Sequence, residues 1–294
     1  MTTPMLLLRG LYKELQRGVG GSVKWRARCD LTRTFTSNHP KPYTVPDGPK
    51  GLNRAARLEL AAAYRGLDQL GLNEGVSNHL SVLAPRADGD GKVMLVFPEG
   101  LHWKEVTASN LVGLDKDART VEGEGSPETT ASVIHLALHR YRPDTTVVMH
   151  THQPYVTALA LMEDMELRMV HQNSLRFWQR VAYDNVYAGV AYDVEEGERL
   201  AQALGDKDVL IMANHGVLVT APTIAMACEM LYFLERAAMV QILAMSTQQK
   251  LREIPEEVGR KLKPEYMKRA QTYADDFFYS MYRLLKQSQP DFEN

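Results

Sequence analysis

The chain has 294 residues, of which 45% are hydrophobic and 24% are charged, and its formal net charge is -2. This composition supports a large buried core and lacks the basic excess of a general nucleic-acid-binding protein. The two cysteines, Cys29 and Cys228, form neither a disulfide framework nor a thiolate metal site, which indicates a reducing compartment. No apolar stretch reaches the roughly 18 residues of a membrane span. We therefore expect no nucleic-acid partner, no membrane partner and a cytoplasmic location.

Residues 1–51 differ from the rest and are expected to form a basic arm followed by a linker. Basic residues clearly outnumber acidic ones up to Arg33, and residues 6–15 have the pattern of a basic amphipathic helix. A mitochondrial transit peptide has this character, so a mitochondrial location is the alternative to the cytoplasm. The same composition is also consistent with an N-terminal arm that has no targeting role. Four prolines within 37–51 indicate the linker.

Regular elements begin at residue 52. Apolar residues at helical spacing predict a helix over 53–70, which Gly71 ends as a C-terminal cap. After a loop with glycine and asparagine, two short apolar runs predict strands over 79–83 and 92–97, joined by a turn. This part of the chain is therefore expected to be a helix followed by a β-hairpin.

A second helix is well marked. Ser126 is a preferred N-cap, Pro127 suits the first helical position, and Pro143 stops the helix after about Tyr141. The remaining strands are expected at 145–149, 209–212 and 217–220, and the remaining helices at 154–162, 193–205, 222–245 and 264–286. Because no strict βαβ rhythm is kept, we predict an α/β fold with a central mixed, mainly antiparallel sheet and helices on both faces.

Three histidines stand directly after predicted strands. His150 and His152 follow the strand at 145–149, and residues two apart on a strand point to the same side. His215 follows the strand at 209–212, and Gly216 after it permits a backbone that other residues resist. Three histidines with one open position are the usual catalytic zinc arrangement. The alternative is polar cover at a strand end.

A helix carries another pair of histidines. His135 and His139 lie four apart on one face, and Glu128 lies seven residues before His135 on roughly the same face. Such a pair is a possible metal site in its own right. We favour a polar helix face that lines a cleft or a subunit contact.

Four linked motifs in the same order resemble the class II aldolases and the adducin head domain. They are GLNEG at 71–75 with NHLSV at 78–82, FPEGL at 97–101 with EVTASNL at 105–111, the stretch from Arg142 to His152, and NHG at 214–216 with LERA at 234–237. The second motif looks especially like the adducin branch. The likeness spans residues 52–248, which we take as the domain, with 249–294 as a C-terminal helical extension.

This resemblance implies a three-layer α/β/α fold, a homotetramer and an active site near a subunit interface. It also implies a divalent ion, most simply Zn2+, held by His150, His152 and His215. Well-known members cleave or epimerise small sugar phosphates. In them the metal acts as a Lewis acid on a carbonyl or enediolate oxygen, and an acidic residue shuttles the proton.

Several positions depart from the family pattern. The family aldolases place their catalytic glutamate where this chain has Ala131, so Glu128 is the candidate acid/base here. Glu99, beside Gly100, stands where phosphate-binding members carry small polar residues, and its carboxylate would repel a phosphate. Asn78 and His79 replace the glycine–asparagine pair of the first phosphate loop. We therefore expect an unphosphorylated substrate, contacted by Asn78, His79, Glu99, Gly100 and His135.

The segment after the predicted helix at 154–162 offers further candidates. Gln172 and Arg176 are expected to meet an anionic group, since arginine presents a planar fork to carboxylates. Tyr183 is the candidate proton donor, with Tyr187 as the alternative. An equally simple interpretation places Arg176 at the surface or at an interface.

The leading hypothesis is a metal-dependent carbon–carbon lyase, an aldolase or a decarboxylase, acting on a small hydroxy-carbonyl or carboxylate substrate. Both reactions form an enolate-like intermediate that a cation stabilises. Epimerisation or dehydration at the same metal stays open. The alternative is a non-catalytic, adducin-like interaction module, suggested by the missing glutamate at Ala131. Against it, the long basic tail of adducins has no counterpart in the sequence after residue 249.

Overall fold

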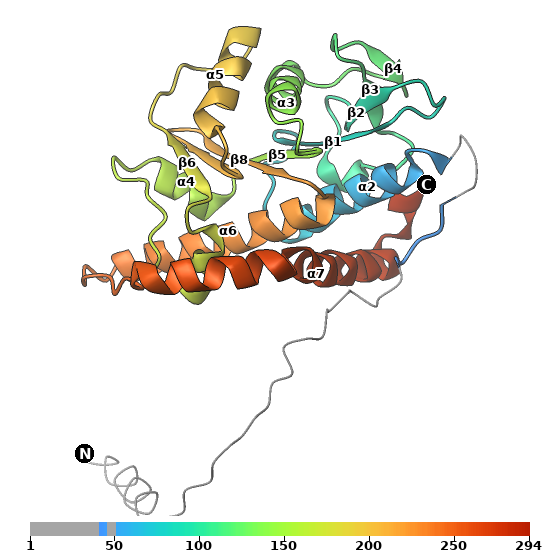
Figure 1. Cartoon of the computed structure of the whole chain (residues 1–294). Coiled ribbons are helices and arrows are strands. Elements are labelled where there is room, and N and C mark those ends of the chain that lie inside the picture. Colours follow the sequence, from blue (N-terminus) through green and yellow to red (C-terminus); the bar gives the residue numbers. More distant parts are fainter. Residues whose placement is uncertain (1–40, 46–50) are drawn as a thin grey trace, which may run out of the picture. The chain divides into compact units, whose positions relative to one another are not determined.

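The structure is a computed structural model that describes residues 41–45 and 51–294 (Figure 1). The basic helix predicted at 6–15, most of the predicted linker and Cys29 lie outside the described residues. None of the described helices combines the length and the apolar character needed to cross a bilayer.

A single sheet organises the described part of the chain. Its strands follow the order β4-β3-β2-β1-β5-β8-β7-β6, and β6–β7 is the parallel pair among otherwise antiparallel neighbours. The strands are β1 (His79–Pro85), β2 (Lys92–Val96), β3 (Val112–Leu114), β4 (Thr120–Glu122), β5 (Val147–Thr151), β6 (Val181–Asp184), β7 (Val209–Met212) and β8 (Gly216–Ala221). The predicted mixed, mainly antiparallel sheet is confirmed.

Helices cover both faces of this sheet and complete three layers (Figure 1). On one face lie α3 (Thr129–Tyr141) and α5 (Val194–Leu204), packed against each other. The other face carries α2 (Arg54–Gln69), α4 (Pro154–Ala160) and α6 (Ile224–Met245), and α7 (Glu256–Ser288) packs against α2 and α6. Short 3-10 helices lie at Trp103–Glu105, Gln172–Phe177 and Pro290–Glu293. The α/β/α architecture expected from the resemblance is confirmed.

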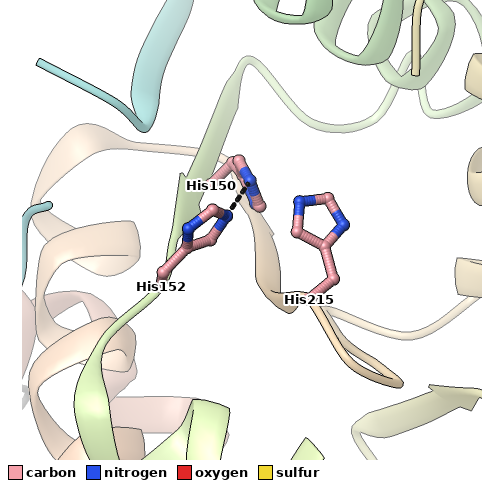
Figure 2. Close-up of side chains that lie close together, drawn as sticks. All are labelled: His150, His152 and His215. Atoms are coloured by element: carbon pink, nitrogen blue, oxygen red, sulfur yellow. Dashed lines mark hydrogen bonds between the residues drawn. The ribbon is translucent and has the colours of Figure 1, made fainter. Parts of the chain in front are cut away.

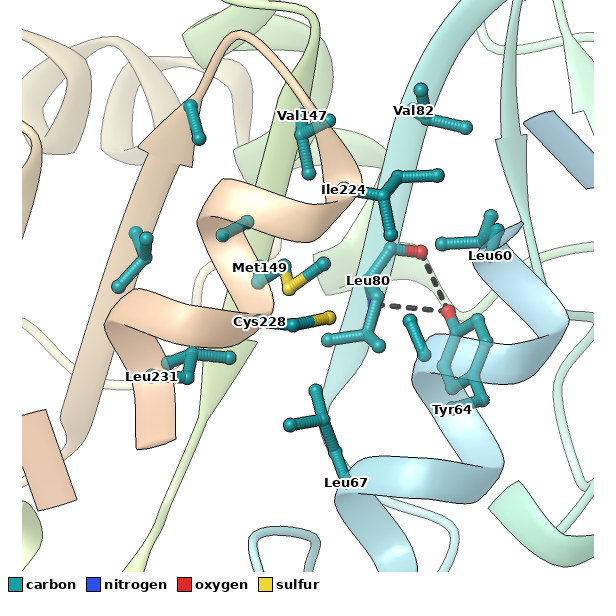
Figure 3. Close-up of a cluster of buried hydrophobic side chains, with 14 of the residues drawn as sticks. Leu60, Tyr64, Leu67, Leu80, Val82, Val147, Met149, Ile224, Cys228 and Leu231 are labelled. Atoms are coloured by element: carbon teal, nitrogen blue, oxygen red, sulfur yellow. Dashed lines mark hydrogen bonds between the residues drawn. The ribbon is translucent and has the colours of Figure 1, made fainter. Parts of the chain in front are cut away.

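The alternation of side chains along β5 divides the core into two halves. Val147 and Met149 point into the larger cluster beneath α2 and α6, while Val148 points to the smaller cluster beneath α3 and α5. Figure 3 shows the larger cluster, where the Tyr64 hydroxyl donates to the Leu80 carbonyl at 2.6 Å. Because β5 alternates strictly, its next polar residue, His150, faces the α3 side.

The starts of α3 and α7 differ from the prediction. Helix α3 starts at Thr129 with Glu128 as N-cap, whereas Ser126 was the predicted cap. The Ser126 carbonyl accepts the Glu99 N–H at 2.9 Å, which holds this residue in the preceding loop. Helix α7 starts at Glu256, well before the predicted start, and continues through Pro264.

The C-terminal segment 249–294 shares the main core. Phe278 and Tyr282 of α7 and Phe292 near the chain end are buried in the same cluster as α2 and α6. Arg65 of α2 is also buried, and it pairs with Asp291 at 2.8 Å. This segment therefore packs as part of the domain that carries the site.

Candidate metal centre and pocket

The middle of the sheet carries the first two metal-ligand candidates. His150 lies inside β5, one residue later than the predicted strand end, and His152 follows directly after the strand. Strand β5 is paired on both sides, with His79 of β1 and Leu218 of β8 opposite His150. His150 is therefore held on a rigid, buried backbone.

Hydrogen bonds fix the tautomers of these two rings. His150 Nδ1 donates to the Val217 carbonyl at 3.0 Å, and His152 Nδ1 donates to the Glu74 carboxylate at 2.5 Å. A carbonyl and an ionised carboxylate only accept, so in the neutral form of each ring Nε2 carries the lone pair. A metal-bound histidine usually makes such a second hydrogen bond.

The two Nε2 atoms face each other at 3.0 Å, as the dashed line in Figure 2 marks. Two lone pairs at this distance repel each other unless a proton or a metal cation lies between them. Tetrahedral zinc with bonds of about 2.05 Å sets its ligand nitrogens roughly 3.3 Å apart. The donor set and its spacing fit a divalent cation.

His215 completes the group from the turn between β7 and β8. Its ring centroid lies 4.8 Å from that of His150 and 5.0 Å from that of His152. One nitrogen from each of the three rings lies within 4.8 Å of the others. Burial and the neighbouring imidazole of His152 lower the pKa of His215 to about 4, so this ring is neutral and able to bind a metal.

The turn that carries His215 has its special backbone at Asn214, not at Gly216. Asn214 has φ 56°, a left-handed conformation that asparagine tolerates, while Gly216 has no positive φ. Gly216 is required for another reason. A Cβ there would lie 2.6 Å from the Thr151 carbonyl oxygen and 2.7 Å from Cδ2 of His152. The glycine makes room for the ligand ring.

The three rings open into a cavity of about 590 Å³. Besides the three histidines, its polar lining consists of Ser77, Asn78, His79, Glu99, Glu128, Thr130 and Asn214. Its apolar wall consists of Val76, Phe97, Ile134, Tyr187, Val190 and Ala191. None of the described residues that line it is a lysine or an arginine. The cavity therefore combines a cluster of three histidines and two carboxylates with an apolar wall.

Asn78 is buried and fixed at the edge of this cavity. It adopts φ 71°, its Oδ1 accepts the His152 N–H at 3.1 Å, and its carbonyl accepts Trp103 Nε1–H at 3.3 Å. Its Nδ2 has no hydrogen-bond partner among the described residues. Asn78 thus positions a ligand histidine and keeps an amide donor beside the cavity.

Comparison with known proteins identifies the architecture. Residues 58–242 match the family model described as the class II aldolase and adducin N-terminal domain. The chain belongs to this family. Class II aldolases typically depend on a divalent metal, and family members are often oligomers that bind small substrates.

Individual relatives agree with the family match. An adducin-related protein of Schizosaccharomyces pombe is 34% identical over 195 residues, which cover 64% of this chain and 58% of that protein. A solved aldolase II superfamily protein from Pseudomonas syringae is 32% identical with a TM-score of 0.74, covering 83% of this chain and 96% of that one. An L-fuculose 1-phosphate aldolase from Glaciozyma antarctica shares the fold, with a TM-score of 0.72, 23% identity and coverage of 85% and 96%.

Glu128 lies in the cavity at the N-terminus of α3. Its Oε2 accepts the Ala131 N–H at 3.0 Å and the Thr130 hydroxyl. Burial raises the pKa of Glu128, but these hydrogen bonds and nearby His79 outweigh it and leave the pKa below its usual value. The residue is therefore a carboxylate at neutral pH. Ala131, at the position that the resemblance matches to the glutamate of the aldolases, is buried and supplies no acid.

His79 and His135 occupy different positions relative to the cavity. His79 lines it, with its ring centroid 5.0 Å from that of His150. His135 lies behind His79 and is fully buried, with Nε2 at 2.8 Å from His79 Nδ1. The prediction that His135 contacts substrate is therefore corrected, because the His79 ring separates it from the cavity.

Three predicted site residues lie away from this cavity. The Tyr183 hydroxyl accepts the Leu167 N–H at 3.0 Å, and burial raises its pKa to about 12. Gln172 and Arg176 line a separate groove beside α7, where Arg176 forms an ion pair with buried Glu229. In the same chain these side chains do not reach the cavity. Tyr187 is the tyrosine that lines it.

Sequence reasoning missed Glu74 and Thr130 as parts of the site. Glu74 lies in the GLNEG loop far along the chain from His152, and no pattern links an exposed loop carboxylate to that ring. Thr130 follows Glu128 closely at the start of α3. The Thr130 hydroxyl lies between His79 and Glu128, and this position depends on where α3 begins. The sequence placed that start too early.

Proposed function

We propose that this chain is a divalent-metal-dependent lyase that cleaves a carbon–carbon bond in a small, unphosphorylated hydroxy-carbonyl or carboxylate substrate. The observation that carries the proposal is the facing pair of Nε2 atoms of His150 and His152, with His215 beside them, in a cavity that also holds the Glu128 carboxylate. Zn2+ is the proposed ion, because neutral imidazoles at this spacing suit it.

The lining of the cavity supports an unphosphorylated substrate. It contains Glu99 and Glu128 and, among the described residues, no lysine or arginine. A phosphate dianion would meet two carboxylates and no cationic side chain, which is unfavourable in a partly buried site. The apolar wall around Tyr187 and Val190 favours a substrate with an alkyl or aryl part.

The side chains divide the chemistry between them. A bound divalent ion would supply Lewis acidity for a carbonyl or enolate oxygen. Asn78 Nδ2 would donate a hydrogen bond to a substrate oxygen. Glu128 Oε2 accepts the Thr130 hydroxyl and the Ala131 N–H, so Oε1 is the proposed atom that takes the proton from the substrate hydroxyl and returns it to the enolate carbon.

Elemental analysis of purified protein tests the metal site. We expect about one divalent ion per chain in the wild type, its loss in His150→Ala, and its retention in the control His102→Ala, whose ring caps a 3-10 helix outside the cavity. Circular dichroism would confirm that both variants are folded. A wild type that takes up no metal, even when Zn2+ is offered, would refute the proposal.

A pair of inhibitors tests the substrate class. Acetohydroxamate chelates a metal through two oxygens, and a phosphorylated hydroxamate adds a dianion to the same chelating group. We expect the unphosphorylated compound to bind at least as tightly in calorimetry, because the cavity offers the dianion no cation. Binding of the phosphorylated compound tenfold or more tighter would favour a sugar phosphate instead.

The second candidate function is a non-catalytic, adducin-like interaction module. It is supported by the adducin-related relative and by Ala131 in place of the glutamate of the aldolases. Co-sedimentation with actin and spectrin tests it. Saturable binding, together with no metal uptake, would place this function first.

We further propose a homotetramer and a cytoplasmic location, with the mitochondrion as the alternative if the basic arm is a targeting signal. An exposed apolar rim beside the cavity, formed by Val186, Tyr187, Val190 and Tyr192, supports self-association. Light scattering after size-exclusion chromatography measures the oligomer, and imaging of a C-terminal fusion tests the location.

A further inference from the structure

Behind the candidate metal ligands, a line of buried polar side chains crosses from β1 to α3. His79 Nδ1 lies 2.8 Å from His135 Nε2, His135 Nδ1 lies 2.6 Å from Ser81 Oγ, and Ser81 Oγ lies 3.0 Å from His139 Nε2. All four side chains are at most 6% exposed. We name these four residues the histidine chain.

Two periodicities build the histidine chain. His79 and Ser81 lie two apart on β1 and share the face that α3 covers. His135 and His139 lie four apart on α3 and share the face toward β1. Each hydrogen bond therefore joins a side chain of the strand to a side chain of the helix.

At its cavity end the histidine chain continues to the candidate base. His79 Nε2 lies 3.3 Å from Thr130 Oγ1, and the Thr130 hydroxyl contacts Glu128 Oε2. An ionised carboxylate only accepts hydrogen bonds. The single hydroxyl proton of Thr130 is therefore directed to Glu128.

The hydrogen bond from Thr130 to Glu128 fixes which atom donates in every other hydrogen bond of the histidine chain. With its proton committed to Glu128, Thr130 Oγ1 accepts from His79, so His79 is protonated at Nε2 and bare at Nδ1. His135 must then donate from Nε2, which leaves its Nδ1 to accept the Ser81 hydroxyl proton. Ser81 Oγ in turn accepts from His139 Nε2, because its own proton is used.

The end of the histidine chain at His139 supports the same direction of hydrogen bonding. His139 Nδ1 is buried and has no hydrogen-bond partner among the described residues. In the direction derived above this atom is a bare acceptor. The opposite direction would place an N–H there, and a buried N–H without a partner is the rarer and more costly defect.

We propose that the histidine chain is a positioning device in which every proton points toward Glu128, so that this carboxylate is kept as an oriented acceptor at the edge of the cavity. The inference rests on the proposed function, in which Glu128 is the base. His135, Ser81 and His139 act only through His79 and Thr130. The same order fixes the His79 ring against His150, at 5.0 Å between centroids.

The test is solid-state NMR of zinc-loaded, full-length protein labelled with 15N-histidine, which reports the protonated nitrogen of each ring. Single His→Gln variants assign the signals. We expect protonated Nε2 on His79, His135 and His139. A protonated Nδ1 on His79 or His135 would overturn the proposal.

The metal ligands give an independent reading in the same spectrum. His150 and His152 are expected to be protonated at Nδ1, the opposite tautomer, because they donate to Val217 and Glu74. If these two rings fail this expectation, the proposed metal site is wrong, whatever the histidine chain shows. The two proposals can therefore fail separately.

A matched pair of variants tests whether Glu128 sets the direction. Thr130→Val removes the hydroxyl that links His79 to Glu128, while Thr129→Val makes the same change at the exposed neighbouring position. We expect mixed tautomers on His79 and His135 in the first variant and unchanged tautomers in the second. Unchanged tautomers in folded Thr130→Val would refute the proposed role of Glu128.

Discussion

The close approach of Gly216 to a candidate metal ligand gives a quantitative prediction for Gly216→Ala. The new methyl group would lie 2.6 Å from the Thr151 carbonyl oxygen, which belongs to the β5–β8 pairing and has little freedom to move. The His152 ring, at 2.7 Å, must then give way by about 0.7 Å to reach ordinary contact. Metal–ligand distances tolerate only about 0.2 Å, so the displaced ring is a poor ligand.

Two effects are expected from this substitution. Overpacking should lower the free energy of unfolding of the metal-free protein by about 1–3 kcal/mol. Zinc affinity should fall about 10–100-fold, equivalent to about 1.4–2.7 kcal/mol of binding free energy. Competition with a fluorescent zinc chelator measures the affinity, and urea unfolding measures the stability.

Gly197→Ala is the matched control for this experiment. Its added methyl group would lie 2.8 Å from the Val133 carbonyl oxygen, between α5 and α3 and away from the metal ligands. It should therefore lower stability, partly offset by the helix propensity of alanine, and leave zinc affinity unchanged. If Gly216→Ala also left zinc affinity unchanged, the proposed dependence of the metal site on this glycine would be wrong.

Three further predictions concern the same site. Glu74→Gln should weaken zinc binding about 10–100-fold in the chelator assay, because the carboxylate that orients His152 is lost. Glu128→Gln should abolish turnover yet retain one metal per chain by elemental analysis, since Glu128 is no metal-ligand candidate. Burial lowers the pKa of His79 and His139 to about 3, so metal-free protein should lose stability in urea unfolding as pH falls from about 6.5 toward 3. His139→Gln should reduce that slope, by up to roughly 1.4 kcal/mol per pH unit.

The direction of this pH dependence follows from proton binding. The unfolded chain protonates these histidines near their ordinary pKa of 6.5, whereas the folded chain resists protonation until about pH 3. Between these values the unfolded state binds more protons, so acid favours unfolding. Above pH 6.5 both states are neutral at these rings and the contribution is constant.

The side-by-side placement of His150 and His152 could be predicted from the sequence because it depends on local periodicity, whereas His215 was added only by the family resemblance. A His-x-His pair at a strand end presents both rings on one side whatever surrounds it, and His150 and His152 lie in this way. The sheet class followed equally from the order of strands and helices. Where one short-range rule governs a position, the sequence was sufficient.

Long-range contacts set the features that the prediction missed. Ser126 satisfies the local rule for an N-cap, yet its carbonyl pairs with Glu99 in a distant loop, and α3 starts later. Arg176 was predicted to meet a substrate anion, but buried Glu229 on α6 already pairs with it. The Tyr183 hydroxyl accepts the Leu167 N–H away from the cavity, while Tyr187 in the following loop lines the cavity. None of these partners is visible from local spacing.

The later start of α3 bears on the choice between enzyme and interaction module. It makes Glu128 the N-cap, whose Oε2 accepts the Ala131 N–H and the Thr130 hydroxyl while the residue lines the cavity. A purely structural cap would be served as well by serine or threonine, which would place no carboxylate beside the two facing imidazoles. The two Nε2 atoms repel each other unless a cation or a proton lies between them, so the site is unfavourable when it is metal-free and both rings are neutral. A cluster of this kind favours cation binding and chemistry, so we rank the proposed enzyme above the interaction module.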